Sequence, residues 1–410
     1  MSSLLNRPAT RPVRSGAAAR KPASTWARLD WWLLLATVGL CALGSLLVWS
    51  ATSHRTDLTG GDSTAYLTKQ LTNIAIGGVL GGVIAATDRR WVRLWAPVIY
   101  LGSVLGLLAI FSPLGATVNG SHSWLLLGGM SIQPAELAKL GVIVGMALVL
   151  AERTEGVRRT ELRSSDVVPA LAIAAAPMLL ILGQPDLGTL IVLTATVFGV
   201  LALSSAPKRW LIGLVTAGLV AVTAAIGVGV LKSYQMARLG AFVDPSLDPQ
   251  GAGYNTDQAR IAIGNGGLFG QGLFHGSQTQ AGFVPEQHTD FVFTVAGEEL
   301  GLVGAGVLIF LMALLLWRVL RIARNADDLF GRLAAGGVAC WFGFQAFQNI
   351  GMCLGIMPVT GVPLPLVSYG GTSMFASLMA LGLVQNIHLR AERSLGLGVV
   401  VRSRIARSRL

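Results

Sequence analysis

The stretch FVPEQHTDFVFTVAGEELGL, residues 283–302, joins a polar loop to a long apolar run. We interpret the apolar run as a membrane helix, and the loop before it carries Glu286, His288 and Asp290. A carboxylate at the start of a membrane helix is costly to desolvate. Asp290 is therefore expected to face water, a partner or a substrate rather than lipid.

Glu298 and Glu299 repeat this pattern farther along the predicted helix. In an α-helix, Asp290, Thr294 and Glu298 would lie within about 80° of one another, with Glu298 about 12 Å from Asp290 along the axis. The ordinary interpretation is a helix end in the headgroups, with acids paired inside the bundle. Because several acids and a histidine share one window, we favour a functional site on a polar face of this helix.

The composition of the whole chain sets the fold class. Of its 410 residues, 53% are hydrophobic and only 12% are charged, and the mean hydropathy is +0.63. These values exclude an ordinary soluble domain and predict an all-α polytopic membrane protein. The three cysteines, Cys41, Cys340 and Cys353, fall in apolar stretches, so we expect packing roles and neither disulfides nor a cysteine metal site.

Ten apolar runs are candidates for membrane spans, although several are only marginally long. They cover residues 31–50, 71–87, 94–111, 137–151, 167–183, 188–203, 210–231, 291–317, 333–357 and 371–387. The largest connection, residues 232–290, lies between the seventh and eighth runs, and its length suggests a function. Within it, the short amphipathic run QARIAI is predicted to lie on the membrane surface.

The basic residues predict the orientation of the chain. Residues 1–30 form a disordered basic tail and residues 391–410 a second basic tail, on either side of a transmembrane domain of residues 31–390. These tails and alternate loops hold 25 of the 31 Lys and Arg residues. By the positive-inside rule both tails are cytoplasmic and the loop of residues 232–290 is extracytoplasmic. The positive charge then faces anionic membrane lipids, and no nucleic-acid partner is expected.

One of the six remaining cations, Lys139, lies in the segment IQPAELAKLG, residues 132–141. Gln133 is expected to cap the helix that begins here, and Glu136 lies near its positive end. Glu136 and Lys139 are spaced i, i+3, so they share a face and can neutralise each other. A purely structural pair and a Lys139 that binds a substrate phosphate are equally supported.

Another of these cations, Arg238, precedes Asp244 and Asp248 in the large loop. A capped, solvated helix end competes here with an anion-binding arm. No zinc spacing, P-loop, dinucleotide fingerprint or nucleophile elbow occurs in the chain.

Two segments rich in proline and glycine interrupt the apolar runs. GQPDLGT, residues 183–189, is predicted to be a structural turn in which Asp186 caps the next helix. GIMPVTGVPLPLVSYGGTS, residues 355–373, would break a helix, and irregular backbone at membrane depth must be buried in protein or line a cavity. We interpret this segment as the wall of an outer pocket, with Ser368 and Tyr369 as candidate substrate-binding residues.

Several motifs in one order resemble those of the SEDS (shape, elongation, division and sporulation) family across nearly all of residues 30–390. The motifs are QPAELAK, QPDLGT, RLGAFVDPSLDPQGAGYN, IAIGNGGLFGQG, PEQHTDFVF, GEELG and NIGMCLGIMPVTGVPLPLVSYGGTS. The segment PVTGVPLPLVSYGG resembles the RodA elongation branch more than the FtsW division branch.

The resemblance implies a peptidoglycan glycosyltransferase that polymerises lipid II outside the cytoplasmic membrane, for cell elongation and shape. It implies a class B penicillin-binding protein as the transpeptidase partner, within the elongation machinery. It also implies that Asp290, at the position of the aspartate in the family's HTDF motif, is the catalytic residue.

The residues themselves agree with a mechanism that uses one base. A sugar on a pyrophosphate lipid carries its own leaving group, so no general acid is needed, unlike in glycoside hydrolysis. Asp290 suits the base, and Lys139, Arg238 and Lys69 suit the departing undecaprenyl pyrophosphate. Glu286 and His288 are further candidates for substrate binding. A divalent cation, Mg²⁺ or Mn²⁺, is an alternative source of positive charge, with Asp290 as its ligand.

Three other functions remain open from the sequence alone. A flippase for lipid II also fits intramembrane acids and broken helices, although an alternating carrier does not require the large outer loop. A division polymerase of the FtsW type and a scaffold without chemistry are the others.

The charge asymmetry generates a test of topology. A cysteine placed at Ser246 should react with an impermeant thiol reagent added outside, and one placed at Ser164 should not. The reverse labelling pattern would overturn the orientation and, with it, the outward site.

Overall fold

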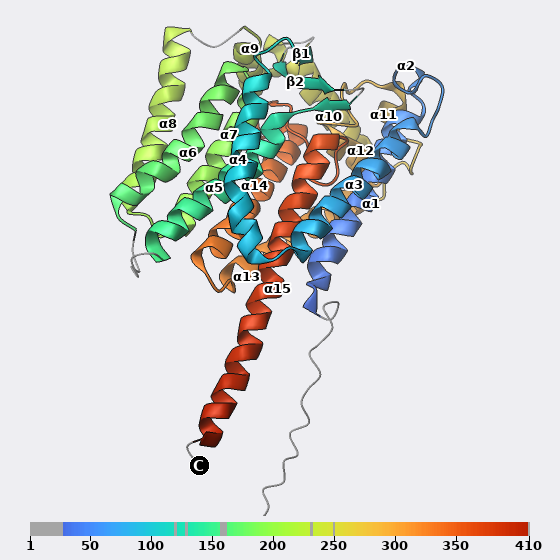
Figure 1. Cartoon of the computed structure of the whole chain (residues 1–410). Coiled ribbons are helices and arrows are strands. Elements are labelled where there is room, and N and C mark those ends of the chain that lie inside the picture. Colours follow the sequence, from blue (N-terminus) through green and yellow to red (C-terminus); the bar gives the residue numbers. More distant parts are fainter. Residues whose placement is uncertain are drawn as a thin grey trace, which may run out of the picture.

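The computed structural model describes residues 28–118, 121–127, 130–155, 162–229, 233–248 and 251–408. Within these residues the chain is a bundle of long helices with a small sheet at one end, and the last helix projects beyond the other end (Figure 1). The helices of the bundle are α1 (Trp31–Ser53), α3 (Ala65–Ala86), α4 (Arg89–Ala109), α5 (Pro134–Glu155), α6 (Ser164–Gly183), α7 (Leu187–Leu203), α8 (Lys208–Val228), α13 (Gly301–Arg324), α14 (Leu329–Leu354) and α15 (Gly371–Ser408).

Nine of the ten predicted apolar runs each coincide with one of these helices, and the run 291–317 covers a short helix and most of α13. Seven of the described helices, α1, α3, α4, α5, α6, α8 and α13, are long and apolar enough to cross a membrane, and α7 is apolar but shorter. The all-α membrane fold is therefore confirmed. The crossing of α7, α14 and α15, and so the total of ten spans, stays a prediction.

The core of the bundle is formed by α5 and α14, whose inner residues are almost all buried. In contrast, α8 buries none of its residues and lies at the edge of the bundle (Figure 1). Its exposed side chains, such as Val215, Leu219 and Val222, are apolar, as lipid contact requires. Cys41 and Cys353 are buried and Cys340 is partly buried, and all three are free thiols, as predicted.

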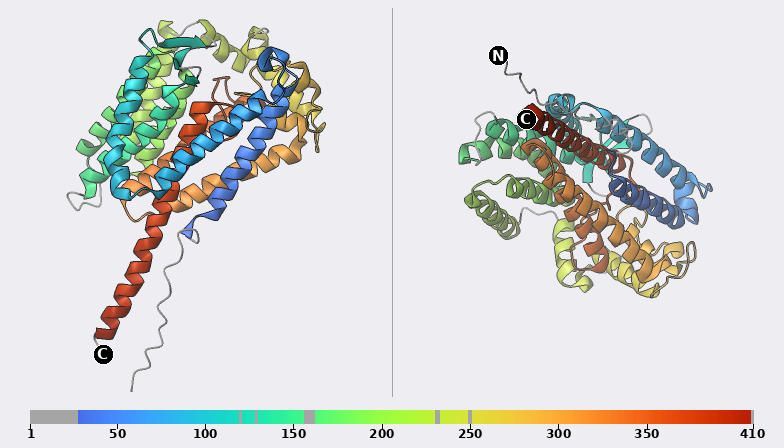
Figure 2. Two further views of the ribbon diagram at one scale, coloured as in Figure 1. Left: turned by 45° about the vertical axis from the view of Figure 1, so that its right-hand side comes forward. Right: turned by 90° about the horizontal axis from the view of Figure 1, so that it is seen from below.

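Glycines let α3 and α15 approach each other closely. A Cβ added to Gly382 would lie 2.2 Å from the carbonyl oxygen of Gly81, so neither position has room for a side chain. At the C-terminal end of α3, Asn386 of α15 donates to the carbonyls of Ile84 and Ala85. Figure 2 shows α1, α3 and α15 running side by side.

The predicted helix after Asp290 is wrong in one respect, because it is two helices. The short helix α12 (Val292–Glu299) ends at Leu300, and Gly301, with φ of +67°, starts α13. The loop before them supplies partners to both ends, since Gly272 N–H donates to Glu299 O and Leu302 N–H donates to Gly267 O. The loop thus caps one helix and begins the other, which the apolar pattern alone does not reveal.

The large loop is mostly helical. It contains α9 (Ser233–Val243), the 3₁₀ turn η2 (Pro245–Leu247), α10 (Ala252–Asn265) and α11 (Ser277–Ala281). The run QARIAI lies in α10, where Ala259 and Ala262 are fully buried against protein and Ile261 is exposed. This run therefore packs on the bundle with one face, and its position at the membrane surface stays a prediction.

A three-stranded antiparallel sheet, which the sequence did not predict, lies between α4 and α5. Its strands β1 (Gly115–Val118), β2 (Ser121–Leu127) and β3 (Met130–Ile132) follow one another in space as in sequence. A ring nitrogen of His122 lies 2.9 Å from Ile110 O and attaches the sheet to the end of α4. A short helix, α2 (Thr56–Thr59), follows α1 at the same end of the bundle (Figure 1).

The two predicted tails have different outcomes. Residues 1–27 of the N-terminal tail lie outside the described residues. In the C-terminal part, α15 continues without interruption to Ser408, so residues 391–408 extend this helix.

Candidate active site around Asp290

Asp290 lies in a tight turn before α12, outside any helix. The N–H groups of Thr289, Asp290 and Phe291 all donate to the carbonyl of Glu286, over 3.0–3.2 Å. Glu286 itself has φ of +51°, a conformation that costs energy for any residue except glycine. The turn therefore holds the Asp290 backbone in one place at the price of local strain. Because Asp290 precedes the helix, it does not share a helical face with Thr294 and Glu298.

Three amide side chains on one face of α14 hold the segment that follows this helix. Gln345, Gln348 and Asn349 donate to the carbonyls of Pro363, Pro358 and Val362, over 2.7–3.0 Å. We call these three residues the α14 amide row. The carbonyls belong to the predicted proline- and glycine-rich segment, which is indeed irregular between α14 and α15. Irregular backbone in a bundle needs such partners, because no helix satisfies its carbonyls.

The amide row also fixes Asp290. Asn349 Nδ2 donates to Asp290 O over 2.7 Å as well as to Val362 O over 2.8 Å. On the other side, a Cβ added to Gly361 would lie 3.2 Å from Asp290 Oδ2, and Gly361 has φ of +71°. A glycine thus leaves room beside the carboxylate where a side chain would press on it.

The surroundings of Asp290 favour its protonated form. Burial raises the pKa of Asp290 to about 7, Glu286 adds to the rise, and Arg238 opposes it. The side chain is nevertheless partly exposed, so a ligand can reach it. A carboxyl with a pKa near neutrality and access from outside has the properties of a general base.

Glu136 and Lys139 form a closed buried pair. Lys139 Nζ lies 2.6 Å from Glu136 Oε1 and 2.7 Å from Gln345 Oε1, and 5.0 Å from the ring centre of Trp341. The Lys139 side chain has no exposed area. In this geometry the pair is structural and braces the amide row. Binding of a phosphate by Lys139 stays a prediction and requires these partners to move.

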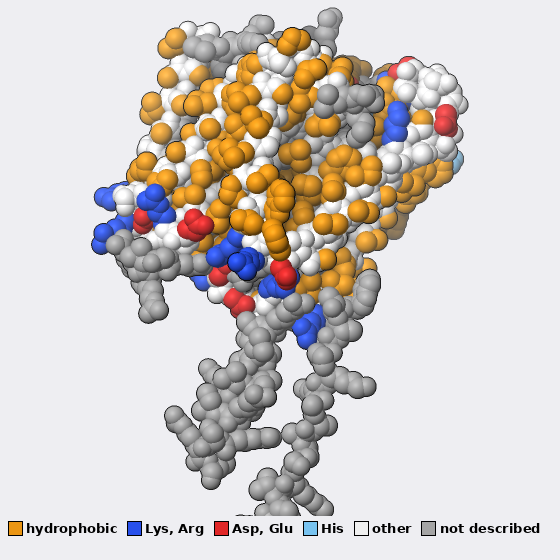
Figure 3. Space-filling view, viewed as in Figure 1, with side chains coloured by type: hydrophobic (Ala, Val, Ile, Leu, Met, Phe, Trp, Pro, Cys, Tyr) orange, Lys and Arg blue, Asp and Glu red, His pale blue; other side chains and the backbone are white. Residues whose placement is uncertain are grey.

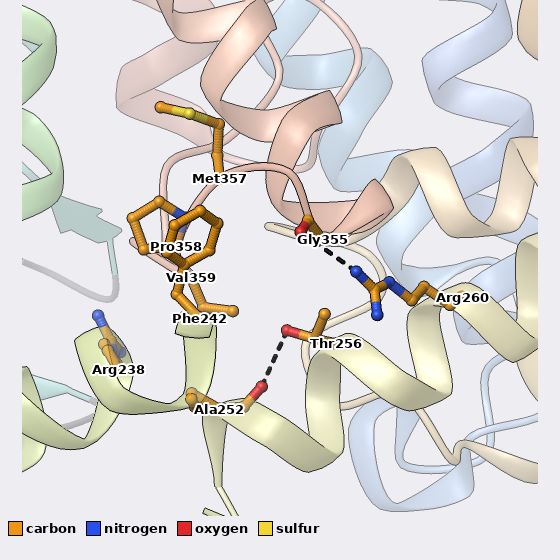
Figure 4. A pocket seen from close by; sticks show the side chains of 10 residues that line it. Arg238, Phe242, Ala252, Thr256, Arg260, Gly355, Met357, Pro358 and Val359 are labelled. Atoms are coloured by element: carbon orange, nitrogen blue, oxygen red, sulfur yellow. Dashed lines mark hydrogen bonds between the residues drawn. The ribbon is translucent and has the colours of Figure 1, made fainter. Parts of the chain in front are cut away.

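Arg238 lies on α9, with its guanidinium 5.6 Å from the ring centre of Tyr234. It lines a small pocket between α9, α10 and the end of α14, and Arg260 lies at the opposite end of this pocket (Figure 4). Arg260 donates to the carbonyls of Leu354 and Gly355, both over 3.2 Å. The positive charge of Arg238 attracts the ionised carboxylate of Asp290 and so opposes the rise of its pKa.

The acids that follow Arg238 in sequence have local roles. Asp244 accepts from the N–H and hydroxyl of Ser246, and Asp248 accepts from Ala252 N–H. These contacts fit the predicted capping.

His288, Tyr369 and Lys69 come together at one place, with Tyr66 between them. The ring centre of Tyr66 lies 5.1 Å from that of His288 and 4.8 Å from that of Tyr369, and Lys69 Nζ lies 5.3 Å from the Tyr66 ring. Tyr369 N–H donates to His288 O over 2.9 Å, so this cluster adjoins the Asp290 turn. Burial lowers the pKa of His288, which keeps its imidazole neutral near pH 7.

Ser368 contributes to this region through the backbone. It is buried, its hydroxyl accepts from Leu364 N–H over 2.8 Å, and its carbonyl accepts from Gln70 of α3. The Glu286 carboxylate is exposed and lies 3.1 Å from the hydroxyl of Thr289. Glu286, His288 and Tyr369 thus surround the Asp290 turn, whereas Ser368 shapes the neighbouring loop.

The two glutamates of α12 are not part of this site, which corrects the predicted polar face. Glu298 is fully buried and accepts from the N–H groups of Gln278 and Thr279, over 2.7 and 2.9 Å. Glu299 accepts from Ser50 Oγ over 2.7 Å. Both acids fasten the loop before Asp290 to the bundle.

Two predicted helix caps, Asp186 and Gln133, lie near this site. Asp186 caps α7 by accepting from Thr189 N–H over 3.0 Å, as predicted. Gln133 does not cap α5 with its side chain, which donates to Asp186 Oδ2 over 3.3 Å instead. No local sequence pattern indicates the roles of Tyr66, Gly361 or the amide row, since each depends on which segments meet in space.

The described residues contain no group of three His, Cys, Asp or Glu side chains that converge as metal ligands. Magnesium is commonly held by one or two carboxylates together with substrate phosphates. Asp290 fits one such ligand, so a cation would have to arrive with the phosphates.

Comparison with known proteins decides the family. A family model described as "Cell cycle protein", which covers FtsW, RodA and SpoVE, matches residues 31–393. The chain belongs to this family. The SEDS resemblance is thereby confirmed.

Relatives of this SEDS chain include proteins of Escherichia coli and Bacillus subtilis. Peptidoglycan glycosyltransferase MrdB of Escherichia coli (strain K12) is 39% identical over 361 residues, covering 88% of this chain and 93% of the relative. Stage V sporulation protein E of Bacillus subtilis (strain 168) is 35% identical over 359 residues, covering 87% of this chain and 96% of the relative.

Two solved structures share the SEDS fold of this chain. The rod shape determining protein RodA of Thermus thermophilus matches with a TM-score of 0.64 and 32% identity, covering 89% of this chain and 98% of that one. A chain from a peptidoglycan synthase complex that coordinates polymerization and crosslinking matches with a TM-score of 0.73 and 32% identity, covering 88% and 98%. The similarity to MrdB and RodA agrees with the predicted likeness to the elongation branch.

The buried pair generates a prediction. Either single change, Glu136→Lys or Lys139→Glu, should reduce the folded yield, because an unpaired buried charge costs about 3–5 kcal/mol. The double variant that swaps both charges should recover yield and, with it, glycan polymerisation. Size-exclusion profiles and a polymerisation assay measure the two. A well-folded double variant without polymerisation would instead retain Lys139 as a ligand of the substrate.

Proposed function

We propose that the protein is a peptidoglycan glycosyltransferase that polymerises lipid II, with Asp290 as its general base. Membership of the family supports the enzyme class. The observation that carries the assignment of the base is the Asp290 carboxyl, which is partly exposed, fixed by its turn and by Asn349, and has a pKa of about 7.

In this reaction a hydroxyl oxygen of the acceptor sugar attacks the anomeric carbon of the donor sugar. The bond from that carbon to the pyrophosphate oxygen breaks, and undecaprenyl pyrophosphate leaves with the bonding electrons. Asp290 takes the proton of the attacking hydroxyl. One displacement of this kind inverts the anomeric centre, and the leaving group is acidic enough to need no proton.

The negative charge that develops on the pyrophosphate needs a counter-charge. Lys69 is exposed beside the aromatic cluster, and Arg238 acts on Asp290 from α9. These two cations are our first candidates to bind the leaving group. A divalent cation bound to the phosphates would add further positive charge, with Asp290 as one ligand.

The orientation and the partners complete the proposal. On the face drawn in Figure 3, most of the Lys and Arg side chains gather at the end of the bundle from which α15 projects. By the positive-inside rule this end is cytoplasmic, and the sheet and the large loop at the other end are extracytoplasmic. The similarity to a chain of a synthase complex supports a class B penicillin-binding protein as the crosslinking partner, and the likeness to RodA supports a role in elongation.

Replacement of the base is the test of this function. Purified Asp290→Asn should lose about 10²- to 10⁴-fold in lipid II polymerisation, because the amide cannot accept the proton. Asp290→Glu keeps the charge but moves it by about 1 Å, and should lose on the order of 10²-fold. Insertion and yield should be close to those of the native protein.

Asp244→Asn is the matched control, because Asp244 lies in the same loop but accepts its hydrogen bonds from Ser246. It should polymerise within a few-fold of the native rate. Polymerisation by well-folded Asp290→Asn at a near-native rate would refute the assignment and favour a flippase or a scaffold. A chelator that leaves the native rate unchanged would exclude the metal-ligand role of Asp290.

A further inference from the structure

Helices α1, α3 and α15 line a groove of about 1030 Å³. Its walls are almost wholly apolar, and no residue of the Asp290 turn contributes to them. Gly78 and Gly82 of α3 line it, and a Cβ added to either would meet no atom within 4 Å. Their neighbours Gly77 and Gly81 pack instead on Leu378 of α15. One pair of glycines thus brings α3 against α15, and the other pair keeps the groove wide.

One polar side chain in this groove has no partner. Gln385 of α15 is only 4% exposed, and neither its Nε2 nor its Oε1 makes a hydrogen bond to any described residue. The two hydroxyls in the lining, Thr37 and Ser45, donate to carbonyls of their own helix. A buried amide without partners is rare in folded proteins and indicates that a ligand supplies them.

The depth of Gln385 in the membrane indicates which polar group it meets. Five residues farther along α15, Arg390 pairs with the exposed Asp88 over 2.7 Å, as suits the headgroup layer. Five helical residues correspond to about 7.5 Å. The headgroup layer on each side of a bilayer is roughly 5–8 Å thick. The Gln385 amide therefore lies at the boundary of the hydrocarbon, where phospholipid ester groups are found.

The chemistry of the lining limits the occupant. An apolar partner helix would fit the walls, but its backbone groups are all paired within the helix and leave no partner for Gln385. A polyprenyl chain would fit the apolar walls but offers no hydrogen-bond acceptor to Gln385. Only a lipid with both acyl chains and ester carbonyls satisfies the walls and the amide together.

We propose that this groove binds a glycerophospholipid from the leaflet at the basic end of the bundle. An ester carbonyl of the lipid accepts from Gln385 Nε2, and an acyl chain lies against Gly78 and Gly82. The lipid supports α3 between α1 and α15. Because α3 also carries Tyr66 and Lys69, the bound lipid stabilises the helix that brings these residues to the Asp290 turn.

The test uses the full chain in liposomes of phosphatidylethanolamine and phosphatidylglycerol, doped with phosphatidylglycerol that carries a photoreactive acyl chain. Irradiation should label peptides of α1, α3 and α15 that line the groove. Gly82→Leu fills the groove and should lower this labelling by roughly fivefold or more. Gly218→Leu on the lipid-facing helix α8, where a Cβ also meets no atom within 4 Å, is the matched control and should leave labelling of the groove unchanged.

Gln385→Leu tests the polar contact without filling the groove. It should reduce the phospholipid retained through detergent washing, counted by native mass spectrometry, by roughly 2- to 10-fold, as the loss of one hydrogen bond implies. Native labelling in Gly82→Leu, or native retention in Gln385→Leu, would overturn the proposal. Displacement of the photoreactive lipid by polyprenyl phosphate but not by unlabelled phosphatidylglycerol would also overturn it.

Discussion

Hydrogen bonds from the α14 amide row to carbonyls of residues 358–363 are the contacts on which the site depends. This segment contains prolines and glycines and forms no helix, so its carbonyls need donors from elsewhere. Gln345, Gln348 and Asn349 provide them from one face of a buried helix. Because Asn349 also donates to the carbonyl of Asp290, the same row fixes the Asp290 turn against the irregular segment. Gly361 then lies beside the carboxylate, where an added Cβ would come within 3.2 Å of Asp290 Oδ2.

Burial makes the ionised carboxylate of Asp290 a stronger base than in water, and it also makes this ionised form less stable. The pKa is raised from 3.8 to about 7, chiefly by burial. A carboxyl with a raised pKa stabilises the fold in its protonated form, so this contribution is complete below about pH 4 and is lost as the pH rises through 7. The form that accepts a proton is thus the form that the surroundings stabilise less. The hydrogen bonds of the turn and of Asn349 maintain the geometry when the charge is present.

The sequence predicted the features that depend on local pattern. The apolar runs placed all ten long helices, the proline-rich segment was predicted to be irregular, and Asp186 was predicted to cap α7.

Features that depend on distant segments were missed or misjudged. The break at Leu300 exists because residues 267–272 cap both α12 and α13, and the run from 291 to 317 carries no sign of it. Glu298 and Glu299 were interpreted as part of a polar helix face because they are acids in an apolar run, but their partners are the loop of residues 277–279 and Ser50. Spacing alone likewise left open whether Lys139 serves packing or substrate, since Gln345 and Trp341 are about 200 residues away in sequence.

The dependence of the glycosyl-transfer rate on pH tests the central claim most directly, because it reports the protonation state of the base under turnover. In single-turnover reactions of the native protein with lipid II, the rate should rise with pH, reach half its maximum near pH 7 and level off above. The residual rate of Asp290→Asn should lack this rise. A native rate that is independent of pH between about 5.5 and 8.5, or the same rise in Asp290→Asn, would contradict the assignment of Asp290 as the general base.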